Sequence, residues 1–78
     1  MEHKYIVVQN VYKNADATRV SFGIAVVVEY DGITTVLESI PDLSSDIKPV
    51  ERLVELCNNE KLDPIHLQDV VNDFFAIV

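Results

Sequence analysis

The sequence predicts an α+β fold, in which a three-stranded antiparallel meander is covered on one face by a C-terminal helical hairpin. Between residues 20 and 30 apolar side chains alternate with small or polar ones, the period of a strand with one buried face. Asp31-Gly32 follows this segment and is a strong signal for a tight hairpin. Beyond Pro41 the apolar residues recur at helical spacing instead. Strands followed by helices indicate the α+β class.

We expect the strands at residues 4–12, 19–30 and 33–40. The first is rich in β-branched and aromatic residues, which favour strands, but its alternation leaves open which face is buried. Polar residues 13–18 predict a surface loop between the first two strands. All of these elements fit in one domain, residues 1–78.

A two-residue loop fixes the register between the second and third strands. It places Val26 opposite Leu37 and Ile24 opposite Ser39, and predicts that Ile33 and Leu37 form the buried face of the third strand. The opposite face of the sheet is then more apolar than a solvated face usually is, which indicates a partner. Its apolar residues are Ala25, Val27, Val36 and Ile40.

Two helices are expected at residues 47–59 and 64–76. Pro41 ends the sheet in this interpretation, because proline has no backbone N–H to donate. The first helix begins between Asp46 and Pro49, and the second opens with Asp63 as its cap. The predicted buried stripes are Val50, Leu53, Val54 and Cys57 on the first helix, and Leu67, Val70, Val71 and Phe74 on the second.

Composition excludes several classes of partner. A net charge of -7 argues against non-specific binding to nucleic acid and against docking on anionic membranes. The longest apolar run, residues 24–28, is far below the ~20 residues of a membrane span. One cysteine and no signal-peptide pattern predict a cytoplasmic protein.

A polar stripe on the second predicted helix is the best candidate for chemistry. Its members are spaced three, three and four residues apart, so a continuous helix places them on one face, and carboxylate with imidazole suits a divalent metal. A structural interpretation is stronger: a cap, a histidine bonded to Asp63 or Asp69, and a solvated acidic side. The stripe comprises Asp63, His66, Asp69 and Asp73.

Other features point to structure rather than catalysis. Cys57 continues an apolar helical stripe, and a buried thiol is inert. Gly23 indicates a bulge or a close backbone approach in the second strand. With no grouping of nucleophile, acid and base in the sequence, we expect neither an enzyme nor a cofactor.

The second half of the chain resembles a domain of unknown function found in short bacterial proteins, which we associate with Gram-positive anaerobes. The distinctive string is residues 62–71, Leu-Asp-Pro-Ile-His-Leu-Gln-Asp-Val-Val, followed by Asp73-Phe74. Weaker matches lie at residues 22–24, 40–44 and 50–58. The resemblance implies the layout and a bacterial cytosolic setting, and it supplies no activity.

The surplus apolar surface favours a protein-interaction or regulatory module that binds another protein or forms a homodimer. The predicted contact residues are Ala25, Val27, Val36, Ile40, Phe75, Ile77 and Val78. The alternative is a small-ligand or divalent-metal-binding domain that uses His66, Asp69 and Asp73.

Overall fold

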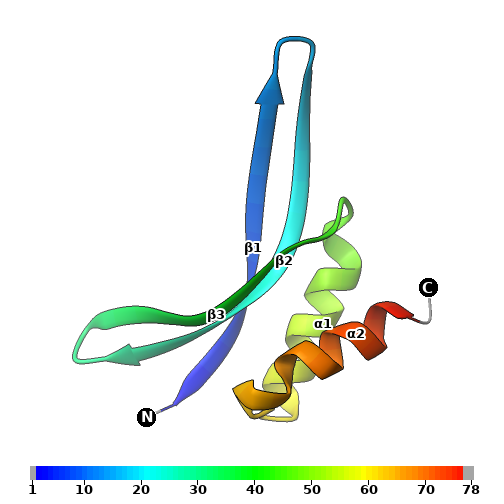
Figure 1. Cartoon of the computed structure of the whole chain (residues 1–78). Coiled ribbons are helices and arrows are strands. Elements are labelled where there is room, and N and C mark those ends of the chain that lie inside the picture. The colour runs from blue at the N-terminus through cyan, green and yellow to red at the C-terminus, as the bar shows by residue number, and fades with distance from the viewer. Residues whose placement is uncertain (1, 77–78) are drawn as a thin grey trace.

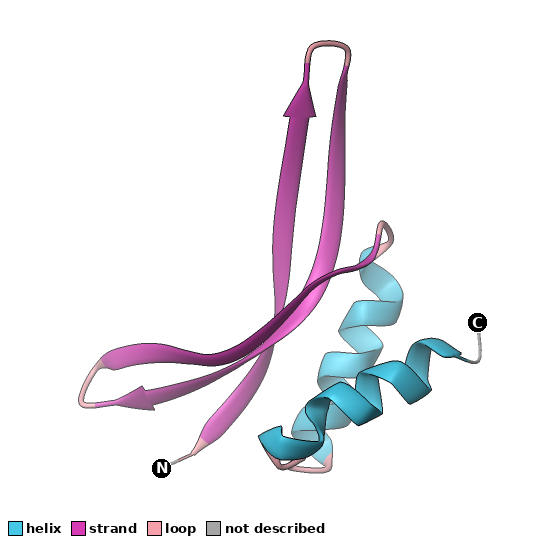
Figure 2. Ribbon diagram, in the orientation of Figure 1, coloured by secondary structure: helices cyan, strands magenta, loops and turns pink. Residues whose placement is uncertain are grey.

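The computed structural model describes residues 2–76, and its α+β architecture confirms the predicted fold class (Figure 1). The strands form one antiparallel sheet in the order β1-β2-β3, and the helical segments follow in sequence (Figure 2). The elements are β1 (His3–Asn14), β2 (Ala17–Tyr30), β3 (Ile33–Ser44), α1 (Ile47–Asn59), the short 3₁₀ helix η1 (Pro64–His66) and α2 (Leu67–Ala76).

The sheet is bent, and its two hairpins diverge from the centre as separate arms (Figure 1). The β1–β2 arm carries the turn between β1 and β2, and the β2–β3 arm (residues 28–37) carries the turn between β2 and β3. The molecule measures 44 × 33 × 17 Å, with a radius of gyration of 13.5 Å. A compact chain of this length has a radius of about 11.5 Å. The helices therefore cover only the centre of the sheet.

The hydrophobic core lies between that centre and the two helices. Ile24 and Val26 of β2 are fully buried there, as their alternation predicts. Tyr5 is buried beside them and pairs with Val26, which settles the face of β1 that the sequence left open. The helices contribute Leu53, Cys57, Leu67 and Val71 to this core.

The register between β2 and β3 is as predicted only near the turn. Asp31 and Gly32 have φ angles of 57° and 80°, which is the type I′ geometry expected of Asp-Gly, and Val28 pairs with Thr35. A β-bulge then shifts the pairing between Val26 and Val27, so that Val26 pairs with Glu38. The predicted pairing of Val26 with Leu37 is wrong, because β3 contains one more residue here than β2.

This bulge changes which residues of β3 face the helices. Ile40 pairs with Ile24 and packs against the core, so its predicted place on the opposite face is wrong. Ile33 and Leu37 were expected to be buried, but they are 67% and 53% exposed. They lie on the β2–β3 arm, beyond the part of the sheet that the helices cover.

A second irregularity surrounds Gly23. A Cβ atom added there would lie against the carbonyl oxygen of Ile40 and 2.7 Å from the Cα of Pro41, so the close approach predicted for this glycine is confirmed. The sheet does not end at Pro41 as expected, because β3 continues to Ser44. Proline is tolerated on an edge strand at a bulge, where its missing N–H breaks no ladder bond.

The other ends of the strands and helices are set by a short turn and by two aspartate caps. The turn between β1 and β2 contains only residues 15 and 16, so the predicted loop at 13–18 is too long. Asp46 caps α1 by accepting a hydrogen bond from Lys48 N at 3.0 Å. Asp63 caps η1 in the same way, and the helix predicted at 64–76 is a 3₁₀ turn followed by α2.

Candidate functional site

The open face of the sheet, which is the face turned away from the helices, exposes little of the predicted contact surface. Ala25 and Val27 are buried, because they lie on the middle strand between the side chains of β1 and β3. Val36 is 58% exposed at the edge of the sheet. Of these three residues, Val36 alone offers an accessible apolar side chain.

The other predicted contact residues do not extend this surface. Ile40 packs against the core on the helix side, and Phe75 of α2 is half-buried against the same core with its ring against that of Phe74. Ile77 and Val78 lie outside the described residues. The surface predicted at the C-terminal end is therefore partly core.

Within residues 2–76, the structure does not bring three members of the polar stripe of the second helix together. Asp63 is used as a cap, its Oδ1 accepting from Ile65 N at 3.1 Å, and His66, Asp69 and Asp73 are exposed. Since Asp63 caps the 3₁₀ helix η1 and His66 lies within it, whereas Asp69 and Asp73 lie on α2, the four residues do not share one continuous α-helical face. Within residues 2–76, no group of three His, Cys, Asp or Glu side chains is placed to hold a metal ion.

The hydrogen bond expected of the His66 side chain is not formed within the described part of the chain. Among residues 2–76, no hydrogen bond joins the His66 ring to Asp63 or Asp69. Its backbone N–H donates to the Asp63 carbonyl at 2.9 Å instead. The histidine that bonds across the fold is His3. Its Nε2 lies 2.7 Å from the carbonyl oxygen of Leu62.

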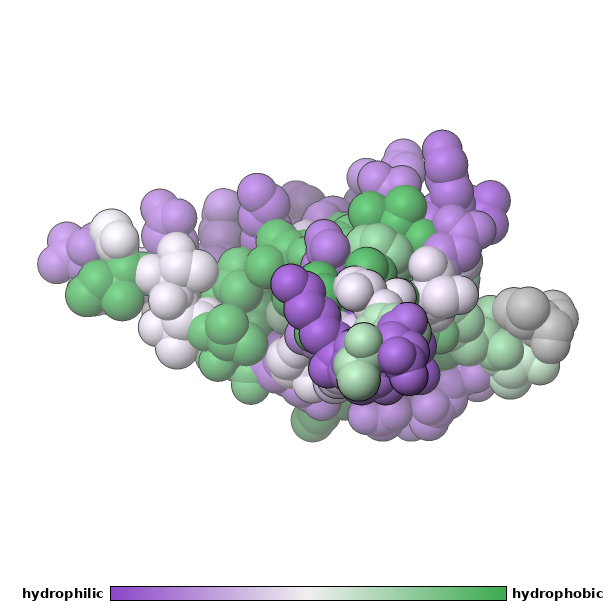
Figure 3. Space-filling model, turned by 90° about the horizontal axis from the view of Figure 1, so that it is seen from above, coloured by the Kyte–Doolittle hydropathy of each residue, from purple (hydrophilic) through white to green (hydrophobic). Residues whose placement is uncertain are grey.

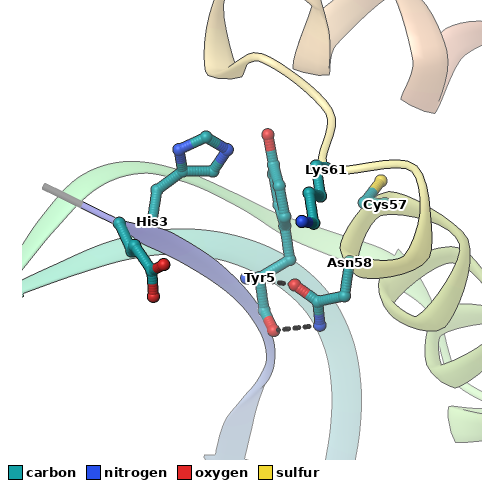
Figure 4. A pocket seen from close by; sticks show the side chains of 6 residues that line it. His3, Tyr5, Cys57, Asn58 and Lys61 are labelled. Atoms are coloured by element: carbon teal, nitrogen blue, oxygen red, sulfur yellow. Dashed lines mark hydrogen bonds between the residues drawn. The ribbon is translucent and has the colours of Figure 1, made fainter.

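His3 belongs to a shallow cavity of about 300 Å³ between β1 and the end of α1 (Figure 4). The Tyr5 hydroxyl donates to the same Leu62 carbonyl at 2.6 Å, and its ring packs edge-on against that of His3. Burial is the main cause that raises the pKa of Tyr5 to about 12. These contacts tie β1 to the segment that links α1 to η1.

The chemistry of this cavity is not that of an activated nucleophile. Cys57 lines it, but burial raises the pKa of the Cys57 thiol above its ordinary value. The reactive form of cysteine is the thiolate, which a raised pKa disfavours. The Tyr5 phenol is neutral and already donates to a carbonyl. The hydrogen bonds of Tyr5 and His3 to Leu62 stabilise the fold.

The outer edge of β1 is closed at Tyr5. The Asn58 side chain accepts from the Tyr5 N–H at 2.8 Å and donates to the Tyr5 carbonyl at 3.0 Å (Figure 4). A side-chain amide thus occupies the place that a neighbouring strand would take. Pairing of another chain along β1 is blocked at this position.

The outer edge of β3 is open on the β2–β3 arm. Among residues 2–76, no strand pairs with its outer side, and residues 33–37 contain no charged residue, proline or glycine. Tyr30, Ile33 and Leu37 lie exposed beside this edge. We call residues 33–37 the open edge. Such an uncharged edge is a template for pairing with another chain.

Apolar side chains accompany the open edge along the arm. In Figure 3 the arm extends to the left, and hydrophobic residues follow it below a rim of hydrophilic ones. A hollow of about 410 Å³ on the helix-facing side is lined by His3, Val28, Tyr30, Thr35 and Leu37. The arm therefore combines free backbone groups with apolar contact area.

The β1–β2 arm is different, because its exposed groups already bond to one another. The Tyr12 hydroxyl donates to the Asp42 carboxylate at 2.7 Å, which holds the pKa of Tyr12 above its usual value. The Arg19 guanidinium lies 5.0 Å from the centre of the Tyr12 ring, a cation–π distance. The polar side chains of these three residues are therefore partly satisfied within the chain.

Comparison with known proteins places the chain in a family. The sequence model of a family of unknown function, DUF6514, matches residues 1–76. The chain belongs to DUF6514. The match includes the first strand, which the resemblance noted in the sequence left out. No curated protein and no solved structure matches the chain. For this DUF6514 member, none of the helices within residues 2–76 is long and apolar enough to cross a membrane.

Proposed function

We propose that this protein is a non-catalytic protein-interaction or regulatory module of the bacterial cytoplasm, and that the β2–β3 arm is its binding surface. The observation that carries the proposal is the open edge, where five uncharged residues leave one side of β3 unpaired beside exposed apolar side chains. The bacterial cytosolic setting is supported by the sequence resemblance and by the single, buried cysteine.

The arm has the composition of an interface core with a polar rim. Tyr30 and Ile33 supply aromatic and aliphatic area, while Glu29, Asp31 and Glu38 lie around them. The acids set the direction of approach of a partner, and the apolar residues supply affinity. A strand of the partner added to β3 would gain backbone hydrogen bonds as well.

Photo-crosslinking in cells tests this function. A photoreactive phenylalanine analogue replaces Ile33 on the arm or, as the control, Ile65, which is 78% exposed on η1. We expect a discrete protein adduct from position 33 and much less from position 65. Equal yields at the two positions, or no adduct from the arm, would contradict the proposal.

A further inference from the structure

We propose that a second copy of this chain occupies the open edge, with the two β3 strands antiparallel about a two-fold axis at Thr35. The inference rests on the proposed function, because it names the partner of that same surface. In the resulting dimer, the three-stranded sheets of the two copies join into one continuous sheet.

The direction of the backbone groups selects this register. In a hairpin closed by a two-residue turn, the pairs Tyr30–Ile33 and Val28–Thr35 exchange hydrogen bonds within the hairpin. The N–H and C=O groups of Thr34 and Val36 therefore point away from β2. An axis at Thr35 places Thr34 of each copy opposite Val36 of the other, so all of these outward groups are paired.

The side chains across this axis are compatible. Ile33 faces Leu37 of the second copy, and Thr35 faces its own counterpart, which gives apolar and β-branched cross-strand pairs. The same register places Glu38 opposite Gly32 and not opposite another acid. The net charge of -7 is thus kept out of the seam itself, although it opposes association at long range.

The accessible surface is large enough for such a contact. The chain exposes 5653 Å², whereas a compact monomer of 8.8 kDa exposes about 4,800 Å². The excess is about 850 Å², a size comparable with the ~800 Å² that each partner buries in a standard interface. Both divergent arms contribute to this excess, and one of them carries the open edge.

The same features limit the assembly to two copies. Asn58 closes the edge of β1 at Tyr5, and the bulge together with Glu38 ends the regular part of β3. A two-fold contact uses the same patch on both copies, so the open edge is fully occupied in the dimer. The expected assembly is a closed dimer and not a fibre.

Disulfide trapping tests the register. Facing residues of a non-hydrogen-bonded pair have Cα atoms about 4.5 Å apart, within disulfide range, so Thr35→Cys should form a covalent dimer under mild oxidation. Thr34→Cys is the matched control, because its two copies would lie about 8 Å apart. The wild-type chain controls for Cys57, which is buried. Equal cross-linking at positions 34 and 35 would overturn the register and the proposal.

Sedimentation equilibrium tests the dimer without cross-linking. We expect twice the 8.8 kDa mass for the wild-type chain, and a dissociation constant at least about tenfold higher for Val36→Lys, since an edge lysine opposes strand pairing. Val11→Lys is the control, because Val11 is exposed on the other arm. An unchanged dissociation constant for Val36→Lys would overturn the proposal.

The two proposals fail in distinguishable ways. A wild-type chain that stays at 8.8 kDa at millimolar concentration overturns the dimer. If Ile33 then cross-links to a different protein in cells, the interaction function stands with another partner. If the arm yields no adduct of either kind, both proposals are wrong.

Discussion

The side-chain amide of Asn58 binds both backbone groups of Tyr5, accepting from its N–H at 2.8 Å and donating to its carbonyl at 3.0 Å. A helix residue thus completes the hydrogen bonding of a strand edge. The two edges of this small sheet are consequently unequal: that of β1 is closed at Tyr5, near the start of the strand, while that of β3 has no such partner along the open edge.

Replacing Asn58 by alanine should lower the free energy of unfolding by about 1–3 kcal/mol, because two backbone groups of Tyr5 lose their partners. Asn59→Ala is the matched control, since Asn59 is the exposed neighbour at the end of α1. Urea titration followed by circular dichroism measures both variants. Equal losses for the two variants would show that the amide does not hold the edge.

Tyr5 should make the protein sensitive to alkali. Because the folded state raises the pKa of Tyr5 from 10.0 to about 12, the unfolded phenol ionises first as the pH rises. The stabilisation is complete below pH ~10 and is lost progressively up to pH ~12, by about 1.4 kcal/mol at pH 11. Tyr5→Phe should lack this part of the pH dependence. Parallel pH profiles of unfolding for the two proteins would refute the assignment.

Two glycines should respond differently to alanine. Gly23→Ala forces a Cβ against the backbone of Ile40 and Pro41, and should cost about 1–3 kcal/mol or more. Gly32→Ala meets no atom within 4 Å, so its cost is only that of an alanine at a positive φ, about 1–2 kcal/mol. Thermal unfolding compares the two, and a Gly23→Ala variant as stable as the wild type would contradict the close approach.

Cys57 should be protected from thiol reagents. It is buried, and burial raises the pKa of its thiol, so both access and thiolate formation are reduced. Labelling with a disulfide reagent at pH 8 should proceed only as fast as the chain opens, and urea should accelerate it. Ile65→Cys supplies an exposed thiol for comparison. Rapid labelling of Cys57 in the native wild-type chain would count against its place in the core.

Most of the strands, turns and helix ends could be predicted from short-range patterns in the sequence. The strand at residues 20–30, the Asp31-Gly32 turn, the start of the first helix near Asp46 and the cap Asp63 each depend on neighbouring residues alone, and the structure contains them. The burial of β2 does not alternate, because residues 23–27 are buried on both faces of the sheet. Gly23 was also predicted to mark a close approach, because a glycine inside an apolar strand needs such a reason.

Long-range packing made the candidate site harder to predict. The open edge was not predicted, although the uncharged run of residues 33–37 was a signal for it. Its exposure depends on how far the helices extend over the sheet, which no local pattern records. The contact of His3 was also not predictable from local patterns, since its partner Leu62 is 59 residues away in sequence.

Three strands, the Asp31-Gly32 turn and the buried stripes of the helices follow from the amino-acid sequence, because each depends on the period and the capping chemistry of adjacent residues. The bulge that turns Ile40 inward and the extension of the β2–β3 arm beyond the helices depend on how the elements pack together. The physical reason is the two-residue period of a strand: one extra residue exchanges its faces, and where that residue is inserted depends on the elements packed against the sheet.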